Sequence, residues 1–290
     1  YFSGENLNLE NVIFYNNSSQ HRGGGIYSKN NSNIILNAVS MHDNSANNSG
    51  GGIYSEDNTS LEFSSVNRSN IYSNIVQNRG FGGDIFSESF VEVVVDTFTV
   101  MQPTGFHASP LENFTFDILN DAFQQVSADL FVSPDGDNAN DGLTPETPLK
   151  TIYNAMSIII ADVTNALTIH LANGIYSQST NGEIFPIQFG DYISLVGESE
   201  NGVILDAEGV NKVMVCSNVS NPAISNLTIT GGVSIPYNIG TGGLLVENSN
   251  TTLENVTITG NSAARGGGIL CLESNLIIRN STISSNSSYP

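Results

Sequence analysis

The sequence is short of positive charge, and it lacks any long apolar run. Only 8 of its 290 residues are Lys or Arg, against 28 Asp or Glu, which gives a formal net charge of −20. Such a balance repels phosphate backbones and anionic lipids, so neither nucleic acids nor membrane surfaces are expected partners. No apolar run approaches the roughly 20 residues that a membrane-spanning helix needs, so no transmembrane segment is expected.

Cysteine is almost absent as well. The two cysteines, Cys216 and Cys271, are too few for a disulfide framework or a cysteine metal site. In the repeat register described below they fall two rungs apart, about 9 to 10 Å at the usual strand spacing, which exceeds the Cα separation that a disulfide tolerates. We therefore expect two free, buried thiols.

The sequence has neither an initial Met nor a signal-peptide pattern. It opens at Tyr1 and stops at Pro290, immediately after a repeat. This pattern favours a monomeric piece of a larger protein, with targeting and anchoring segments elsewhere.

Charged residues make up only 12% of the chain, and tryptophan is absent. The polarity must therefore come from neutral Asn, Ser and Thr. Runs of β-branched and aromatic residues, such as Phe90–Val95, alternate with these polar stretches. Disordered chains avoid such runs, so we expect a folded protein that is rich in β-structure.

A glycine motif recurs along the chain. The segment Gly23–Ser28 (GGGIYS) returns as Gly50–Ser55 and, more loosely, as Gly82–Ser87, while Gly242–Leu244 returns as Gly267–Ile269. Glycine suits a tight corner between strands, where the backbone needs a positive φ or a close approach. One glycine of each copy is a candidate structural position: Gly24, Gly51, Gly83, Gly243 and Gly268.

An asparagine recurs with the same period as these glycines. It follows an apolar residue by three positions in each repeat, and the copies are Asn17, Asn44, Asn74, Asn261 and Asn286. Asparagine tolerates the left-handed conformation of a bend, and stacked asparagines can hydrogen-bond through their amides. We expect a structural asparagine ladder.

The repeat length decides the fold class. A period of about 25–32 residues, built from short alternating apolar runs, excludes the helical repeat arrays. Each sequence repeat is predicted to form three short strands. These strands bury their inward face only when successive coils stack. The sequence therefore predicts an all-β, right-handed parallel β-helix with three-strand rungs, the handedness being that of parallel crossovers in general.

The repeat fades after Ser87, and the stretch 97–125 looks irregular. Beyond it, the apolar spacing in Lys150–Asp162 predicts one short helix, which would cap the open end of a coil. We expect the C-terminal rungs and the end of a first β-helix at 1–126, and the cap and first rungs of a second at 127–290. The alternative is one β-helix interrupted by an insertion.

Two family resemblances follow from these motifs. The rungs resemble the repeats of the polymorphic outer-membrane protein family of bacterial autotransported adhesins, which pair a Phe-x-x-Asn motif with a Gly-Gly-Ala-Ile motif. The first motif is kept at Phe14–Asn17, whereas Gly or Asp replaces the Ala of the second. The resemblance implies a β-helix at a cell surface.

The second resemblance covers about 127–210. The segments Phe131–Pro134 (FVSP), Asp141–Pro148 (DGLTPETP), Ile169–Tyr176 (IHLANGIY) and Leu195–Glu198 (LVGE) are similar to the capping segment, a domain of unknown function, that opens pectate-lyase-like β-helices. That segment is common in large bacterial surface proteins, many of them exported by type IX secretion. The resemblance implies the fold and an extracellular location, but no activity, because the superfamily holds lyases, hydrolases, adhesins and tail spikes.

The sharpest enzyme hypothesis is a polysaccharide lyase, in which Ca²⁺ neutralises a uronate and a basic side chain removes a proton. The candidate bases are Lys212, Arg265 and Arg279. The candidate acids are Glu247, Glu254 and Glu273, although charged residues on outer faces of rungs are common in any solenoid.

The loop Asp135–Asp141 is a candidate structural calcium site. Asp135, Asp137 and Asp141 offer hard oxygen ligands at nearly alternate positions. The spacing departs from an EF-hand, and the alternative is a plain Asx-turn loop. Apart from this calcium, no cofactor is expected.

The sequence as a whole favours a non-catalytic extracellular surface module, adhesin-like or structural, that contacts carbohydrate or other cell-surface ligands. The alternative is a carbohydrate-active β-helix enzyme or its substrate-binding part. Ice or mineral binding is a third possibility, but no face repeats Thr cleanly.

Overall fold

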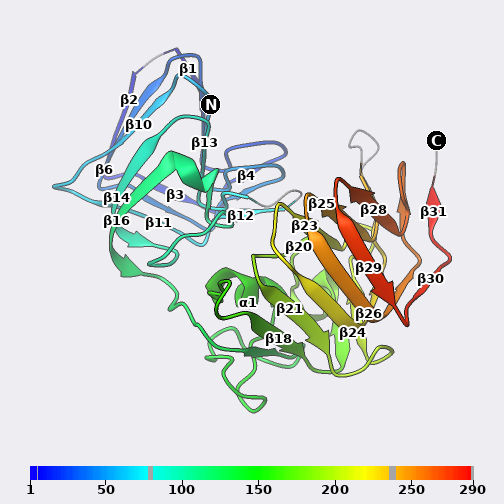
Figure 1. The fold of residues 1–290 in the computed structure, drawn as a ribbon. Helices are drawn as coiled ribbons and strands as arrows, with labels where there is room; N and C mark the ends of the chain where they lie inside the picture. Colours follow the sequence, from blue (N-terminus) through cyan, green and yellow to red (C-terminus); the bar gives the residue numbers. More distant parts are fainter. Residues whose placement is uncertain (5, 78–80, 235–239, 289–290) are drawn as a thin grey trace. The chain divides into compact units, whose positions relative to one another are not determined.

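The computed structural model describes residues 1–290 except 5, 78–80, 235–239 and 289–290. The chain forms two compact units, Tyr1–Gln125 and Val126–Pro290, and each sheet lies within one unit (Figure 1). Helix is limited in the described residues to α1 (Ile152–Ile158), α2 (Gln178–Asn181) and one 3-10 turn, η1 (Leu111–Asn113). None of these helices has the length and hydropathy to cross a membrane.

Four parallel sheets form the first unit. The first contains β1 (Phe2–Ser3), β5 (Ile26–Lys29), β9 (Ile53–Ser55), β13 (Ile85–Ser87) and β15 (Ala108–Ser109). The second contains β2 (Asn6–Glu10), β6 (Asn33–Asn37) and β10 (Ser60–Phe63). The third contains β3 (Ile13–Tyr15), β7 (Ser40–His42), β11 (Ser69–Tyr72), β14 (Val91–Phe98) and β16 (Phe114–Asp121). The fourth contains β4 (Ser18–Ser19), β8 (Ser45–Ala46) and β12 (Ile75–Val76).

Equivalent residues of successive coils lie directly over one another. Ile26 pairs with Ile53, and Ile53 pairs with Ile85. All three side chains are at most 2% exposed. The column of apolar side chains fills the interior of the coil, which supplies most of the driving force for stacking. The predicted right-handed parallel β-helix is confirmed.

The stretch 97–125 is more regular than the sequence suggested. β15 and β16 continue the coil by one further rung, with β16 in register against β14 from Val91↔Phe114 to Phe98↔Asp121. The expectation of an irregular stretch was wrong there. This rung lacks both the Gly-Gly and the Asn motif, but its Phe114, Phe116 and Ile118 alternate with polar residues as a half-buried strand requires.

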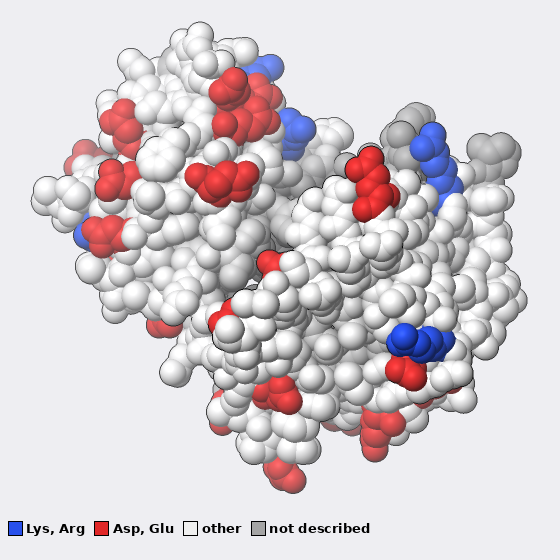
Figure 2. Space-filling model, in the orientation of Figure 1, with Lys and Arg blue, Asp and Glu red and all other residues white. Residues whose placement is uncertain are grey.

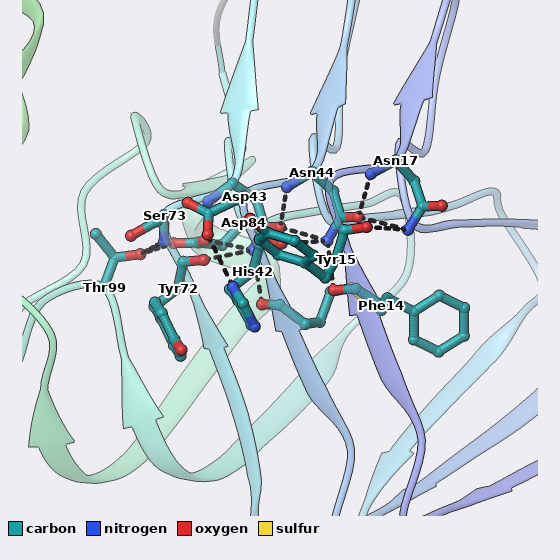
Figure 3. A network of polar contacts seen from close by, with 12 residues as sticks. Phe14, Tyr15, Asn17, His42, Asp43, Asn44, Tyr72, Ser73, Asp84 and Thr99 are labelled. Carbon is teal, nitrogen blue, oxygen red and sulfur yellow. Dashed lines mark hydrogen bonds and ion pairs between the residues drawn. The ribbon is translucent and has the colours of Figure 1, made fainter.

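The recurring asparagines of the first unit hydrogen-bond from rung to rung (Figure 3). The side-chain Nδ2 of Asn17 donates to Oδ1 of Asn44 at 2.8 Å, and Nδ2 of Asn44 donates to Oδ1 of Asn74 at 2.9 Å. The backbone N–H of each Asn donates to the same oxygen. Asn44 and Asn74 are buried at the bend, and these bonds satisfy their polar groups.

Asp84 ends this asparagine column. Its Oδ1 accepts from the backbone N–H of Asn74 at 3.1 Å and from Asn74 Nδ2 at 3.0 Å, where the next asparagine would otherwise accept. Its Oδ2 accepts from Thr99 Oγ1 at 2.6 Å (Figure 3). Asp84 is 1% exposed, and burial raises the pKa of its carboxyl group to about 7, against the opposing effect of these hydrogen bonds.

The glycine positions allow the backbones of neighbouring rungs to approach closely. A Cβ atom on Gly51 would lie 2.3 Å from the carbonyl oxygen of Ile75 and 2.6 Å from that of Gly83. On Gly243 it would lie 2.3 Å from the carbonyl oxygen of Gly268. Any side chain at these positions would push the rungs apart.

The second unit is a longer coil. Its largest sheet contains β17 (Leu130–Val132), β18 (Leu167–Leu171), β19 (Gly174–Tyr176), β21 (Ile193–Gly197), β22 (Val203–Asp206), β24 (Ala223–Thr230), β26 (Asn250–Thr259), β29 (Asn275–Arg279) and β30 (Thr282–Ser284). A second sheet contains β20 (Ile187–Gln188), β23 (Met214–Ser217), β25 (Leu244–Glu247) and β28 (Ile269–Leu272), and a third pairs β27 (Ser262–Ala263) with β31 (Ser287–Ser288).

Helix α1 is shorter than the predicted Lys150–Asp162. It ends at Ile158 because the next residues pair with Val126: the N–H of Val126 donates to the carbonyl of Ile158, and the N–H of Ile160 donates to the carbonyl of Val126. Its buried face joins the core of the second unit. The carboxylate of Glu183 accepts the first helical N–H groups, those of Ile152 and Tyr153, at 2.8 and 3.0 Å.

The two cysteines lie two rungs apart, because both pair with Val246. Both are free. Cys216 is buried, and burial raises the pKa of its thiol to about 12. Cys271 is exposed, contrary to expectation, because it lies on the last rung and no described rung covers it.

Candidate functional site

One corner of the second coil gathers asparagine side chains. It connects β23 to β24, β25 to β26, and β28 to β29. Asn218, Asn248 and Glu273 begin these three turns in the left-handed region, with φ of 54°, 47° and 48°. They are equivalent positions, since the residues before them, Ser217, Glu247 and Leu272, pair in register. Asparagine adopts this left-handed conformation at a small cost in conformational energy.

These turns line an open surface groove of about 500 Å³, which we call the asparagine groove. Its lining consists of Tyr192, Asn218, Val219, Ser220, Asn221, Asn248, Ser249, Asn250 and Glu273. The turn that carries Tyr192 belongs to the preceding rung, and its backbone N–H donates to the carbonyl of Ser220 at 2.9 Å. The groove therefore crosses four successive turns.

Hydrogen bonds between rungs hold the walls of the groove. Nδ2 of Asn248 donates to Oδ1 of Asn218 at 3.1 Å. The Ser249 hydroxyl donates to the carbonyl of Val219 at 2.8 Å. An asparagine amide offers two N–H donors and an acceptor oxygen, so these bonds use only part of its capacity. The walls are thus fixed while exposed amide groups stay available to a ligand.

The groove is nearly uncharged although the protein is strongly acidic. Among the described residues, Glu273 is the one Asp or Glu in its lining, and neither Lys nor Arg contributes. The visible surface of the second unit is likewise mostly free of charged side chains (Figure 2). Such a site lacks an acid–base pair and suits a neutral ligand with many hydroxyl groups.

A second cavity, of about 400 Å³, lies on the outer face of the large sheet near the helical cap. Its floor includes the stacked rings of Phe131 and His170, whose centroids are 4.9 Å apart, and Pro145 and Pro148 form a wall. Nε2 of His170 lies 3.5 Å from Oδ2 of Asp129. His170 therefore sits on the outer face of its strand beside a carboxylate.

The acidic loop forms Asx turns. Oδ1 of Asp137 accepts the N–H of Ala139, and Oδ1 of Asp141 accepts the N–H of Leu143 at 3.1 Å. The hydrogen bond from the Leu143 N–H, with one from the Thr147 hydroxyl, lowers the pKa of Asp141. No three His, Cys, Asp or Glu side chains of the described residues lie close enough to hold a metal ion. Calcium at Asp135, Asp137 and Asp141 stays a prediction.

The candidate bases are not brought together. Lys212 is buried beside β23, Arg265 is exposed before β28, and Arg279 ends β29 in the other sheet. None of them lines either cavity described above. Of the candidate acids, Glu247 accepts the hydroxyl of Ser217, and Glu254 pairs in register with Arg279. Of the three candidate acids, only Glu273 lines one of the two cavities.

Sequence reasoning missed the groove itself. Asn218, Asn221, Asn248 and Asn250 lie outside the repeat motif because the turns between their strands differ in length. The available signal was the recurrence of Asn directly after the strands Met214–Ser217 and Leu244–Glu247. Tyr192 could not be placed, because no repeat motif lies near it.

Comparisons with known proteins agree with the geometry. The stacked parallel strands define a right-handed parallel β-helix protein. The chain belongs to the family described as "Protein of unknown function (DUF1565)", whose profile matches residues 134–289. Residues 11–29 and 38–56 match the Chlamydia polymorphic membrane protein repeat. No curated protein and no solved structure matches the chain.

Proposed function

We propose that this protein is a non-catalytic surface module that contacts glycans through the asparagine groove. The observation that carries the proposal is the composition of that groove: four asparagines, two serines, one tyrosine, one valine and one glutamate around about 500 Å³. Sugar hydroxyl groups both donate and accept hydrogen bonds, and an asparagine amide can also do both. A cavity of this volume is large enough for a small oligosaccharide.

The family matches support a place at the cell surface. The first unit carries two copies of a repeat that is named for a membrane protein family. A formal charge of −20 keeps such a module hydrated and separate from anionic membranes. We infer an extracellular, adhesin-like or structural role, with export of the type IX kind that the capping segment suggests.

A screen of the intact chain on immobilised glycans tests this function. We expect saturable binding to at least one glycan and no release of unsaturated product from uronate polymers, with or without Ca²⁺. Turnover of a uronate polymer that is lost on changing Lys212, Arg265 or Arg279 would support the lyase alternative instead. Absence of binding to every glycan would contradict the proposal.

A further inference from the structure

We infer that the asparagine groove takes a linear, neutral polysaccharide that lies along the axis of the coil, one sugar residue for each rung. This inference rests on the proposed function and specifies its ligand. It combines three features of the groove: its direction, its repeated hydrogen-bonding groups and its charge.

The direction follows from the register of the turns. The groove runs from the turn at Tyr192 across those at Asn218 and Asn248 to the turn at Glu273. Four rungs at the usual strand spacing of about 4.8 Å give a length of about 14 Å. This length is comparable to that of a short linear oligosaccharide, so a chain laid along the axis would meet a new turn at each sugar.

The hydrogen-bonding groups repeat with the same spacing. Asn218 and Asn248 occupy equivalent positions one rung apart, and their amides are joined at 3.1 Å. Asn250 lies on the next strand beside them, and its Oδ1 accepts from Nδ2 of Asn275 at 2.8 Å, one rung further on. A ligand with its own repeat would gain one set of contacts with each rung, so its affinity should rise with its length.

The charge of the groove selects against acidic polymers. Glu273 stands at the corner where a third asparagine would continue the series, and no Lys or Arg of the described residues lines the groove to offset it. A uronate at this position would meet a like charge on a protein that is already strongly acidic. Neutral glycans avoid this repulsion, and their hydroxyl groups can donate to the Glu273 carboxylate.

Length series of linear oligosaccharides test the inference by isothermal titration. The probes are gluco-, manno-, xylo-, galacto- and chito-oligosaccharides, with oligogalacturonides as the acidic series, each from the disaccharide to the hexasaccharide. For at least one neutral series we expect affinity to rise at least roughly tenfold between the disaccharide and the tetrasaccharide, as two further rungs contribute hydrogen bonds.

The chain offers a matched pair of variants. Asn248→Gly removes a groove amide, and Asn255→Gly removes an equivalent amide that bonds Asn226 at 3.1 Å outside the groove. Both positions have positive φ, near 50°, which glycine accepts. We expect Asn248→Gly to weaken binding of the tetrasaccharide by roughly five- to tenfold and Asn255→Gly to leave it unchanged.

The outcomes separate the inference from the function on which it rests. Binding whose affinity does not change with length, or binding of the acidic series alone, would overturn the inference and leave glycan binding in place. An equal effect of both glycine variants would place the ligand outside the groove and overturn it as well. Absence of binding in every series would overturn both. Glu273→Gln should strengthen binding of oligogalacturonides only.

Discussion

Asp84 should make the first unit more stable in acid than at neutral pH. The carboxyl group is 1% exposed, and its pKa rises from 3.8 to about 7 on burial. The folded state therefore holds its proton more tightly than the unfolded chain. This contribution to stability is fully present below about pH 4 and is lost as the pH rises through about 7. A shift of about three pKa units corresponds to about 4 kcal/mol.

Asp84→Asn isolates this effect. The new amide keeps an oxygen for Asn74, and its N–H group can donate to the Thr99 hydroxyl, which turns to accept it. The variant has no proton to lose at this position. We expect it to match the wild type near pH 4 and to become more stable than the wild type by up to about 4 kcal/mol near pH 8.

Urea unfolding between pH 4 and pH 8, followed by circular dichroism, measures the difference between the two proteins. Hydrogen exchange of peptides from β11 and β14 assigns it to the first unit. Other titrating groups, including the buried Glu183 of the second unit, are common to both proteins and cancel. Parallel stability curves for the wild type and the variant, or a difference that shrinks as the pH rises, would refute the reasoning.

Three further predictions concern the rungs and the thiols. Gly51→Ala should destabilise the first unit by more than about 3 kcal/mol in urea unfolding, because its Cβ would meet backbone oxygens of the next rung; a loss within experimental error would argue against such close stacking. Asn44→Leu should cost about 2–4 kcal/mol by the same measurement, since it replaces a buried amide that bonds the buried Asn74 and leaves the amide of Asn17 without its acceptor; an unchanged midpoint would contradict the role of the asparagine column. Cys271 should react with a maleimide within minutes in the folded chain 1–290, whereas Cys216 should react only after unfolding; equal rates would show that the burial pattern is wrong.

The stacking of rungs could be predicted from the sequence because it depends on residues that repeat. Ile26 and Ile53 follow the same glycine motif, and their pairing follows from that spacing alone. The last rung of the first unit could not be found in this way. Its Phe114–Asp121 strand carries the alternation of a strand but none of the marker residues.

The role of Asp84 depends on tertiary structure. In the sequence it is only the third residue of a loose Gly-Gly-x copy, at the place of Gly25 and Gly52. Its side chain fills the position of a missing asparagine because Thr99, from the following rung, supplies a further hydrogen bond. The groove also depends on tertiary structure, since its asparagines become neighbours only when two turns of different length, at 218–222 and 248–249, stack in register.

Hydrogen exchange in the presence of a bound neutral oligosaccharide tests the proposed glycan contact most directly. The account predicts slower exchange in peptides that cover 217–221 and 247–251, and unchanged exchange around Phe131 and His170. Protection confined to the Phe131 and His170 cavity, or to the first unit, would contradict it.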